Sequence, residues 1–434
     1  MKSLLVAAIL LSSVTTSHQA YDTAYKDAAL QSARWIRSHT IRTDHGAVWP
    51  SDPNDKKTVS TNLYSGTPGV VLFFLEAYRS TGDKSYLDDA RAGADHLLAN
   101  LSNEKENGLY TGIAGIGFTL QETYKITRDN KYRQGALRCA ETIAGRAVKT
   151  GKGIEWSDTT DIIGGTAGTG LFLLYSAREL KRTDLGDLAI ASARRLIELA
   201  RPEAGGLKWA MNSEFPRLMP NFSHGTAGIA YFLATVYEES KEKEFLDAAL
   251  AGARYLKSIA VTEGNACLIL HNEPDGKDLY YLGWCHGPVG TARLFYRLYK
   301  VTGDRDWMDW VKKSARAVME SGIPEKQPPG FWNNVSQCCG SAGVAEFFLN
   351  LHEATGERGY LDFSKRVTAN LLARATRDGE EMKWIQAEHR VRPNLLVAQT
   401  GYMQGAAGIG MLLLRLDAFE REKKDRIIFP DSPF

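Results

Sequence analysis

A Gly-x-x-Gly pattern recurs seven times along this chain of 434 residues, each time just before an apolar run. Successive copies are 46 to 65 residues apart, which fits one helical hairpin per repeat with loops of variable length. Because the repeat covers about residues 22 to 420, it predicts one closed unit rather than several linked domains. The copies begin at Gly66, Gly112, Gly165, Gly225, Gly287, Gly340 and Gly405.

The segments that follow the glycines differ in pattern from the segments between them. Residues 229–237 are apolar on nearly every face, which predicts an inner helix with protein on all sides. Residues 86–98 have apolar positions three and four apart and charges elsewhere, which predicts a half-exposed outer helix. Seven outer helices are expected, beginning near Tyr25, Lys84, Lys131, Leu185, Lys243, Asp306 and Glu357.

Seven inner and seven outer helices predict an all-α fold. An open array would leave apolar inner helices uncovered at its ends, and the sequence shows no capping repeats. We therefore expect a double-layered α/α toroid of seven helical hairpins. The glycines would let backbones approach closely where the inner helices converge. Short extended segments are expected at one rim, at residues 46–49, 153–156, 206–209 and 330–332.

The residues just before each first glycine are in register, so a ring would bring them together at one end of its axis. At the position immediately before the glycine stand Ser65, Thr111, Gly164, His224, His286, Cys339 and Gln404. One position further back stand Tyr64, Tyr110, Ile163, Ser223, Cys285, Cys338 and Met403. Three thiols and two imidazoles are thus expected to share one cavity.

Thiolate and imidazole are the ligands that Zn²⁺ selects, so the register predicts a zinc site with Cys285, Cys338 and Cys339 as ligands. Three protein ligands leave the fourth position open, which is typical of a catalytic zinc. Helix N-termini would also lower the pKa of the thiols. His224 and His286 are candidate catalytic residues, and His286 is alternatively a ligand or a partner of one.

Other interpretations of these side chains stay open at this point. Cys338 and Cys339 are adjacent and could instead form a vicinal disulfide or pack as apolar residues. Cys139 and Cys267 lie in apolar or helix-like stretches and are expected to be small buried residues. Three further histidines are expected to have structural roles, namely His96, His271 and His352.

The first twenty residues have the basic start, apolar core and small polar exit of a signal peptide, which leaves residues 21–434 as the folded domain. The apolar part is too short to span a bilayer, so stable membrane insertion is not expected. Two of the three glycosylation sequons, at Asn221 and Asn334, would place a glycan beside the predicted site. A bacterial protein exported to the periplasm or medium is therefore the simpler interpretation.

The net charge of +2 offers no field for nucleic acid, so we expect a monomer that acts on a peptide or a small molecule. The motifs resemble those of lanthionine synthetase C-like (LanC-like) proteins over nearly the full length after the signal segment. The matching segments are the seven Gly-x-x-Gly helices, Asp161-Ile162-Ile163-Gly164-Gly165, Ser223-His224-Gly225, Trp284-Cys285-His286-Gly287 and Cys338-Cys339-Gly340. The resemblance implies an α/α toroid with zinc at its mouth.

Cyclases of that family add a peptide cysteine thiol to dehydroalanine or dehydrobutyrine, which forms a thioether. By resemblance, Cys285 and Cys338 match two zinc ligands, His224 matches the acid/base histidine and Asp161 matches a site aspartate. The third ligand is commonly His, whereas here it is Cys339, as in a three-cysteine subgroup. Position 286 commonly carries Tyr and here carries His. The arginine that some members use has no recognisable counterpart.

These observations predict an exported zinc-dependent enzyme that adds peptide or small thiols to dehydroamino acids or related electrophiles. His224 is the expected proton donor to the enolate. One alternative is a toroid that binds peptides without turnover. The other is a glycosidase resembling the six-hairpin α/α rings, which needs a pair of carboxylates across the cavity. Its candidate carboxylates are Asp161, Glu155 and Glu214.

Overall fold

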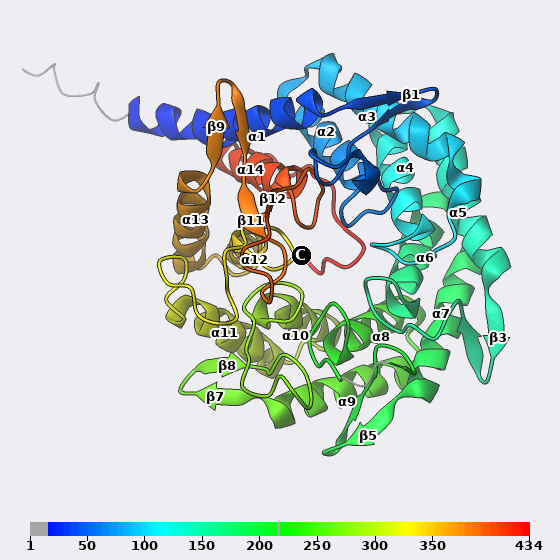
Figure 1. The fold of residues 1–434 in the computed structure, drawn as a ribbon. Coiled ribbons are helices and arrows are strands. Elements are labelled where there is room, and N and C mark those ends of the chain that lie inside the picture. The colour runs from blue at the N-terminus through cyan, green and yellow to red at the C-terminus, as the bar shows by residue number, and fades with distance from the viewer. Residues whose placement is uncertain (1–15, 215–217) are drawn as a thin grey trace, which may run out of the picture.

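The computed structural model describes residues 16–214 and 218–434, so residues 1–15 of the predicted signal peptide lie outside the described residues. The described residues form fourteen α-helices in two concentric layers (Figure 1). The inner layer contains α2 (Thr67–Thr81), α4 (Ile113–Thr127), α6 (Thr166–Leu180), α8 (Thr226–Ser240), α10 (Pro288–Thr302), α12 (Ser341–Thr355) and α14 (Ala406–Glu420). The outer layer contains α1 (Thr16–Ser38), α3 (Lys84–Ala99), α5 (Asn130–Arg146), α7 (Thr183–Leu199), α9 (Lys243–Ile259), α11 (Arg305–Glu320) and α13 (Arg358–Ala373).

Pairing between the first and last helices closes the ring. Each of the first six inner helices packs on the outer helix that follows it in the chain, and α14 packs on α1 (Figure 1). Inner helices are buried all round because they contact neighbours on both sides as well as an outer partner; in α8, every residue from Thr226 to Val236 is buried. The predicted double-layered α/α toroid is confirmed.

The turn from an inner to an outer helix is encoded locally. After α2, Gly82 adopts a left-handed conformation with φ of 73°, and its amide donates to the Tyr78 carbonyl. Asp83 then caps α3, because its carboxylate accepts from the Ser85 amide at 2.9 Å. Similar turns follow α4 and α10, at Arg128-Asp129 and Gly303-Asp304.

Short antiparallel hairpins and single-turn 3₁₀ helices connect the repeats. The paired strands are β1 (Ile41–Thr43) with β2 (Gly46–Val48), β3 (Val148–Thr150) with β4 (Gly153–Glu155), β5 (Arg201–Glu203) with β6 (Gly206–Lys208), β7 (Val261–Glu263) with β8 (Ala266–Leu268), β9 (Thr376–Asp378) with β10 (Glu381–Lys383), and β11 (Ile385–Ala387) with β12 (Leu396–Ala398). The 3₁₀ helices are Lys56–Thr58 and Leu101–Asn103. None of the described helices combines the length and apolar character needed to cross a membrane.

Three of the four expected extended segments are confirmed, since β2, β4 and β6 occupy them. The fourth, residues 330–332, is wrong because this segment forms a turn. Pro328 and Pro329 precede it and have no amide hydrogen for a strand ladder. The Pro328 carbonyl instead accepts from the Phe331 amide at 2.8 Å.

The second glycine of six of the seven patterns is required by the turn in front of its own helix. A Cβ on Gly228 would lie 2.1 Å from the Phe222 carbonyl oxygen, six residues earlier. The same collision, at 1.9 to 2.4 Å from the carbonyl six residues earlier, would occur at Gly115, Gly168, Gly290, Gly343 and Gly408. These glycines therefore allow each turn to pack closely against the helix that follows it. This role adds to the close approach between helices that was expected of them.

Replacing Gly228 by alanine should destabilise the protein by about 1–3 kcal/mol, because backbone must move to accept the methyl group. Gly145 provides a control within the same chain, since it belongs to helix α5 and a Cβ added there would have no neighbouring atom within 4 Å. Gly145→Ala should stabilise the protein by about 0.5–1 kcal/mol. Denaturant unfolding measures both changes, and equal midpoints for the two variants would contradict the packing argument.

Candidate metal centre and catalytic pocket

Seven backbone hydrogen bonds link the turns before the inner helices into a closed ring. Each turn donates an amide to a carbonyl of the next turn, over 2.8 to 3.2 Å. The donor and acceptor pairs are Tyr64 to Tyr110, Tyr110 to Ile163, Ile162 to Ser223, Ser223 to Cys285, Cys285 to Cys338, Cys338 to Met403 and Met403 to Tyr64. The positions aligned by sequence register therefore lie side by side on one backbone circle.

This circle brings three buried thiols together. Cys285, before α10, has its sulfur 3.1 Å from the sulfur of Cys339, before α12. The sulfur of Cys339 is also 3.1 Å from that of Cys338. A disulfide requires about 2.05 Å, so the vicinal pair is not bonded. The structure thus joins the three predicted ligands, although 53 residues separate Cys285 from Cys338.

The cluster fits the donor set of a zinc ion. All three sulfurs lie within 4.8 Å of one another. Tetrahedral zinc with Zn–S bonds of about 2.3 Å would hold its sulfurs about 3.8 Å apart, so small side-chain shifts would admit the ion. Three soft sulfur ligands select zinc over hard cations. A fourth coordination position would remain for a molecule from the adjacent pocket.

One of the three sulfurs is electronically distinct. The pKa of the Cys338 thiol lies well below its usual range, because Cys285 and Cys339 donate to its sulfur. Tyr64 adds a further hydrogen bond, with its hydroxyl oxygen 3.3 Å from the Cys338 sulfur. Gln404 in turn donates to the Tyr64 hydroxyl at 2.8 Å. Among the three thiols, Cys338 is therefore the one whose ionised form is favoured, and Tyr64 and Gln404 support it by hydrogen bonds.

His224, which lines the same pocket, forms a second functional group with Asp161. Nδ1 of His224 lies 2.5 Å from a carboxylate oxygen of Asp161. The other Asp161 oxygen accepts from the amides of Gly164 and Gly165, at 2.8 and 2.9 Å. Burial lowers the pKa of His224, but the Asp161 carboxylate outweighs that effect and the net shift is upward. The buried aspartate thus fixes the histidine ring and favours its protonated form.

His286 is held among aromatic rings beside this pair. Its ring centroid is 4.5 Å from that of His271 and 5.6 Å from that of His224. Burial, together with these two neighbouring histidines, brings the pKa of His286 well below its usual value. The neutral Nδ1 has no hydrogen-bond partner among the described residues. His286 is therefore a buried group whose neutral form is favoured and whose Nδ1 is unpaired among the described residues.

The three groups line one pocket of about 220 Å³. His271, which was expected to have a structural role, lies in this pocket against His286 and Tyr281. Residues 388–391, in the loop between β11 and β12, cover one side of the pocket. They include Arg390, whose guanidinium Nε is 3.4 Å from the Tyr281 hydroxyl. Neither His271 nor Arg390 belongs to a Gly-x-x-Gly turn, so the repeat register gave no signal for them.

The remaining candidates lie elsewhere. Glu155 pairs with Arg195 at 2.7 Å, and Glu214 is exposed. Among the described residues that line the pocket, Glu388 is the only carboxylate, and Asp161 is buried behind His224 with both oxygens hydrogen-bonded. The pair that a glycosidase requires across the cavity is therefore lacking there. Cys139 and Cys267 are buried away from the pocket, and burial raises their thiol pKa values to about 12 and about 11. These two cysteines are small core residues, as expected.

Taken together, the ring of turns and the thiol cluster define an α/α toroid with a candidate metal centre on its axis. The chain belongs to the lanthionine synthetase C-like protein family, which matches residues 57–430. It is 24% identical over 139 residues to the Glutathione S-transferase LANCL1 of Danio rerio. That match spans about a third of each protein, 32% of either chain.

Two solved structures show the same fold. Nisin cyclase superposes with a TM-score of 0.64 at 17% identity, over 93% of this chain and 95% of that chain. An alpha-1,6-mannanase of a Salegentibacter species superposes with a TM-score of 0.50 at 16% identity, over 91% of this chain and 99% of that chain. At these identities the likeness shows the toroid architecture alone, which the two proteins share with this chain.

Proposed function

We propose that this protein catalyses zinc-dependent addition of a thiol to the double bond of a dehydroamino acid in a peptide. The observation that carries the proposal is the convergence of three thiols beside the His224–Asp161 pair in one pocket. The first group supplies soft metal ligands, and the second supplies a proton donor within the same space. A thiol addition to an activated alkene needs both.

Zinc, when held by the three sulfurs, would lower the pKa of a substrate thiol in the open position. The substrate thiol releases its proton to solvent, from which His224 regains a proton after the reaction. The thiolate adds to the β-carbon, a carbon–sulfur bond forms, and the π electrons move to the enolate. His224 protonates the α-carbon of that enolate. Because Nδ1 faces Asp161, Nε2 is the nitrogen left to carry this proton. The overall reaction adds the S–H group across the C=C bond. It has no leaving group and does not change the oxidation state of the metal.

The surrounding residues have supporting roles in this proposal. Asp161 holds the His224 ring and stabilises its cation while the proton is transferred. His286, whose neutral form is favoured, packs beside the His224 ring and helps to hold it in place. The names of two relatives agree with the chemistry, since one is a cyclase of nisin and the other transfers glutathione, a thiol.

A peptide substrate is favoured by the β11–β12 hairpin beside the pocket. Seven large apolar side chains are strongly exposed among the described residues, and four of them belong to this hairpin. Val391 is 74% exposed and also lines the pocket, so the apolar surface continues into the site. The other three are Ile385, Leu395 and Leu396. Exposed apolar side chains gathered beside the mouth of a site are typical of contact with another chain.

Arg390 is the candidate for binding an anionic or carbonyl oxygen of the substrate. Arg390→Gln should raise KM about tenfold with little change in kcat, because a charge-assisted hydrogen bond formed before and during the reaction is lost. Arg392→Gln is the control, since Arg392 is exposed two residues further along the same loop. Steady-state kinetics with one dehydroalanine peptide measures both, and equal KM values would argue against this role.

The function is tested with the full chain made with export intact, which also allows the mature N-terminus to be determined by mass spectrometry. Metal analysis should give one zinc per chain. Incubation with a dehydroalanine peptide and a thiol should give a product whose mass is the sum of the two. Zinc without turnover would support a peptide-binding toroid instead, and a mature N-terminus at Met1 would overturn export.

A further inference from the structure

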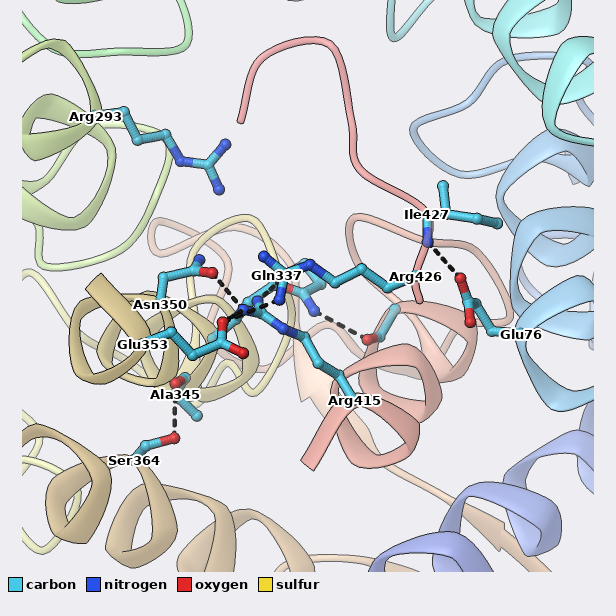
Figure 2. Close-up of polar contacts among 12 residues, drawn as sticks. Glu76, Arg293, Gln337, Ala345, Asn350, Glu353, Ser364, Arg415, Arg426 and Ile427 are labelled. Atoms are coloured by element: carbon cyan, nitrogen blue, oxygen red, sulfur yellow. Dashed lines mark hydrogen bonds and ion pairs between the residues drawn. The ribbon is translucent and has the colours of Figure 1, made fainter. Parts of the chain in front are cut away.

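The C-terminal segment that follows α14, residues 421–434, runs into the centre of the ring (Figure 1). It is anchored on the way by inner helices from different parts of the chain. The Ile427 amide donates to Glu76 of α2 at 2.6 Å, and Arg426 pairs with Glu353 of α12 at 2.9 Å (Figure 2). Phe429 stacks on Tyr402 with ring centroids 4.6 Å apart.

Part of this tail packs against the inner helices beneath the circle of turns, whereas residues 422–425 are exposed. Cavities of about 30 and about 60 Å³ lie between the tail and the inner helices, and a larger one of about 1660 Å³ borders Ile428 and Phe434. The smallest of these accommodates about one water molecule, and Asp431 lines it, so the tail is closely packed around that residue. The last residue, Phe434, stacks on Tyr296 of α10 at 4.4 Å. The buried part of the tail, which includes Asp431, thus belongs to the interior of the toroid.

Asp431 is the buried charge of the tail and is completely inaccessible to solvent. Arg293 of α10 donates to its carboxylate at 3.2 Å and to its carbonyl at 3.1 Å. The Tyr110 hydroxyl, from the second turn of the circle, donates to the other carboxylate oxygen at 3.2 Å. A carboxylate without these partners would be strongly disfavoured there. The position of Asp431 is therefore coupled to those of Arg293 and Tyr110.

Both partners of Asp431 pack on Trp284, the residue immediately before Cys285. The Arg293 guanidinium carbon lies 5.9 Å from the Trp284 ring centroid. The Tyr110 ring meets the Trp284 ring edge to face, with centroids 5.5 Å apart. Trp284 is only 2% exposed and has Phe222 on another side, at 5.6 Å. A displacement of Arg293 or Tyr110 would consequently shift Trp284 and, through it, the backbone of Cys285.

We propose that Asp431 is a positioning residue, which holds Cys285 in place for metal binding through Arg293, Tyr110 and Trp284. This inference rests on the proposed function, because it assumes that the three sulfurs hold a metal. The C-terminal tail would thereby support the metal centre from inside the ring. Groups outside the ligands that orient a ligand typically change metal affinity by about 10–100-fold when removed.

The inference is tested by metal binding to full-length Asp431→Ala, Asp431→Asn and Asp417→Ala. Zinc affinity is measured by competition with a chelator, and Co²⁺ is used as a spectroscopic probe of the thiolate site. Asp431→Ala should bind zinc about tenfold more weakly and shift the cobalt–thiolate absorption. Asp431→Asn, which keeps an acceptor for Tyr110 but loses the ion pair, should give an intermediate affinity. Asp417 is a matched control, because it is 3% exposed and pairs with Arg421 on α14.

Wild-type affinity and spectrum in folded Asp431→Ala would overturn the inference, as would equal losses in Asp417→Ala. Should Asp431→Ala not fold, Arg293→Lys replaces it, since lysine keeps the charge but loses the planar stacking on Trp284. Weaker zinc binding by that variant supports the inference, and unchanged binding overturns it. Failure of the wild-type protein to bind any metal would overturn the proposed function, and the inference with it.

Discussion

Replacing Cys338 by alanine is expected to remove zinc and to lower kcat/KM for thiol addition by about a thousandfold or more. At pH 7, a free thiol with a pKa of about 8.5 is only about 3% thiolate, so loss of activation alone costs about 30-fold. Without zinc, the substrate sulfur is also no longer held near the β-carbon, which should lower the rate by at least about the same factor again. Zinc stoichiometry and steady-state kinetics, measured on the same preparation, check the prediction.

Cys139→Ala is the matched control for this variant. Cys139 is as buried as Cys338 but lies in α5, away from the pocket. Its removal should reduce stability through a small cavity and leave both zinc content and turnover unchanged. Retention of one zinc per chain with normal turnover in Cys338→Ala would refute the role of Cys338. The proposed metal centre would then have to involve other ligands.

His224→Ala should lower kcat by about 10²–10⁴-fold, because the enolate loses its positioned proton donor. Zinc content should not change, since the three sulfurs remain in place. Imidazole added at high concentration should restore part of the rate if the missing group is a proton donor. His352→Ala is the control, because His352 lies on α12 and its Nδ1 contacts the Glu357 carbonyl outside the pocket.

Loss of zinc together with activity in His224→Ala would show that His224 is a ligand, and the proton would need another source. His286 is a poor substitute for that role, because burial and two neighbouring histidines keep it neutral. The two predictions therefore separate the metal ligands from the acid. A variant that lost neither zinc nor rate would exclude both roles.

The repeat was sufficient to predict the fold because each pattern combines a helix start with a buried helix. Gly225, for example, is extended with φ of −147° directly before α8, and Gly228 admits the turn in front of it. Helix starts such as Lys84 and Lys243 were also predictable from their charge pattern. Residues 330–332 were misassigned because a glycine and an aromatic residue occur in turns as readily as at the start of a strand.

Only those site residues that belong to the Gly-x-x-Gly repeat were predictable from the sequence. Cys285, Cys338 and His224 occupy equivalent turns, so register alone placed them together. His271 and Arg390 reach the pocket from segments that have no counterpart in the other repeats. Asp431 follows the last repeat, and its burial depends on a path through the ring that no local pattern specifies. Such contacts arise from the closed shape and not from neighbouring residues.

Closure of the ring by α1 and α14 sets an order for biosynthesis. The ribosome makes α1 first, but its helical partner does not exist until residues 406–420 have been translated. At about 5–20 residues per second, α1 waits roughly 20–80 seconds for that partner. During this time its inward surface, which includes Ala29, Ala33 and Ile36, lacks its final cover. The nascent chain therefore stays incomplete, and dependent on protection from aggregation, until translation is almost finished.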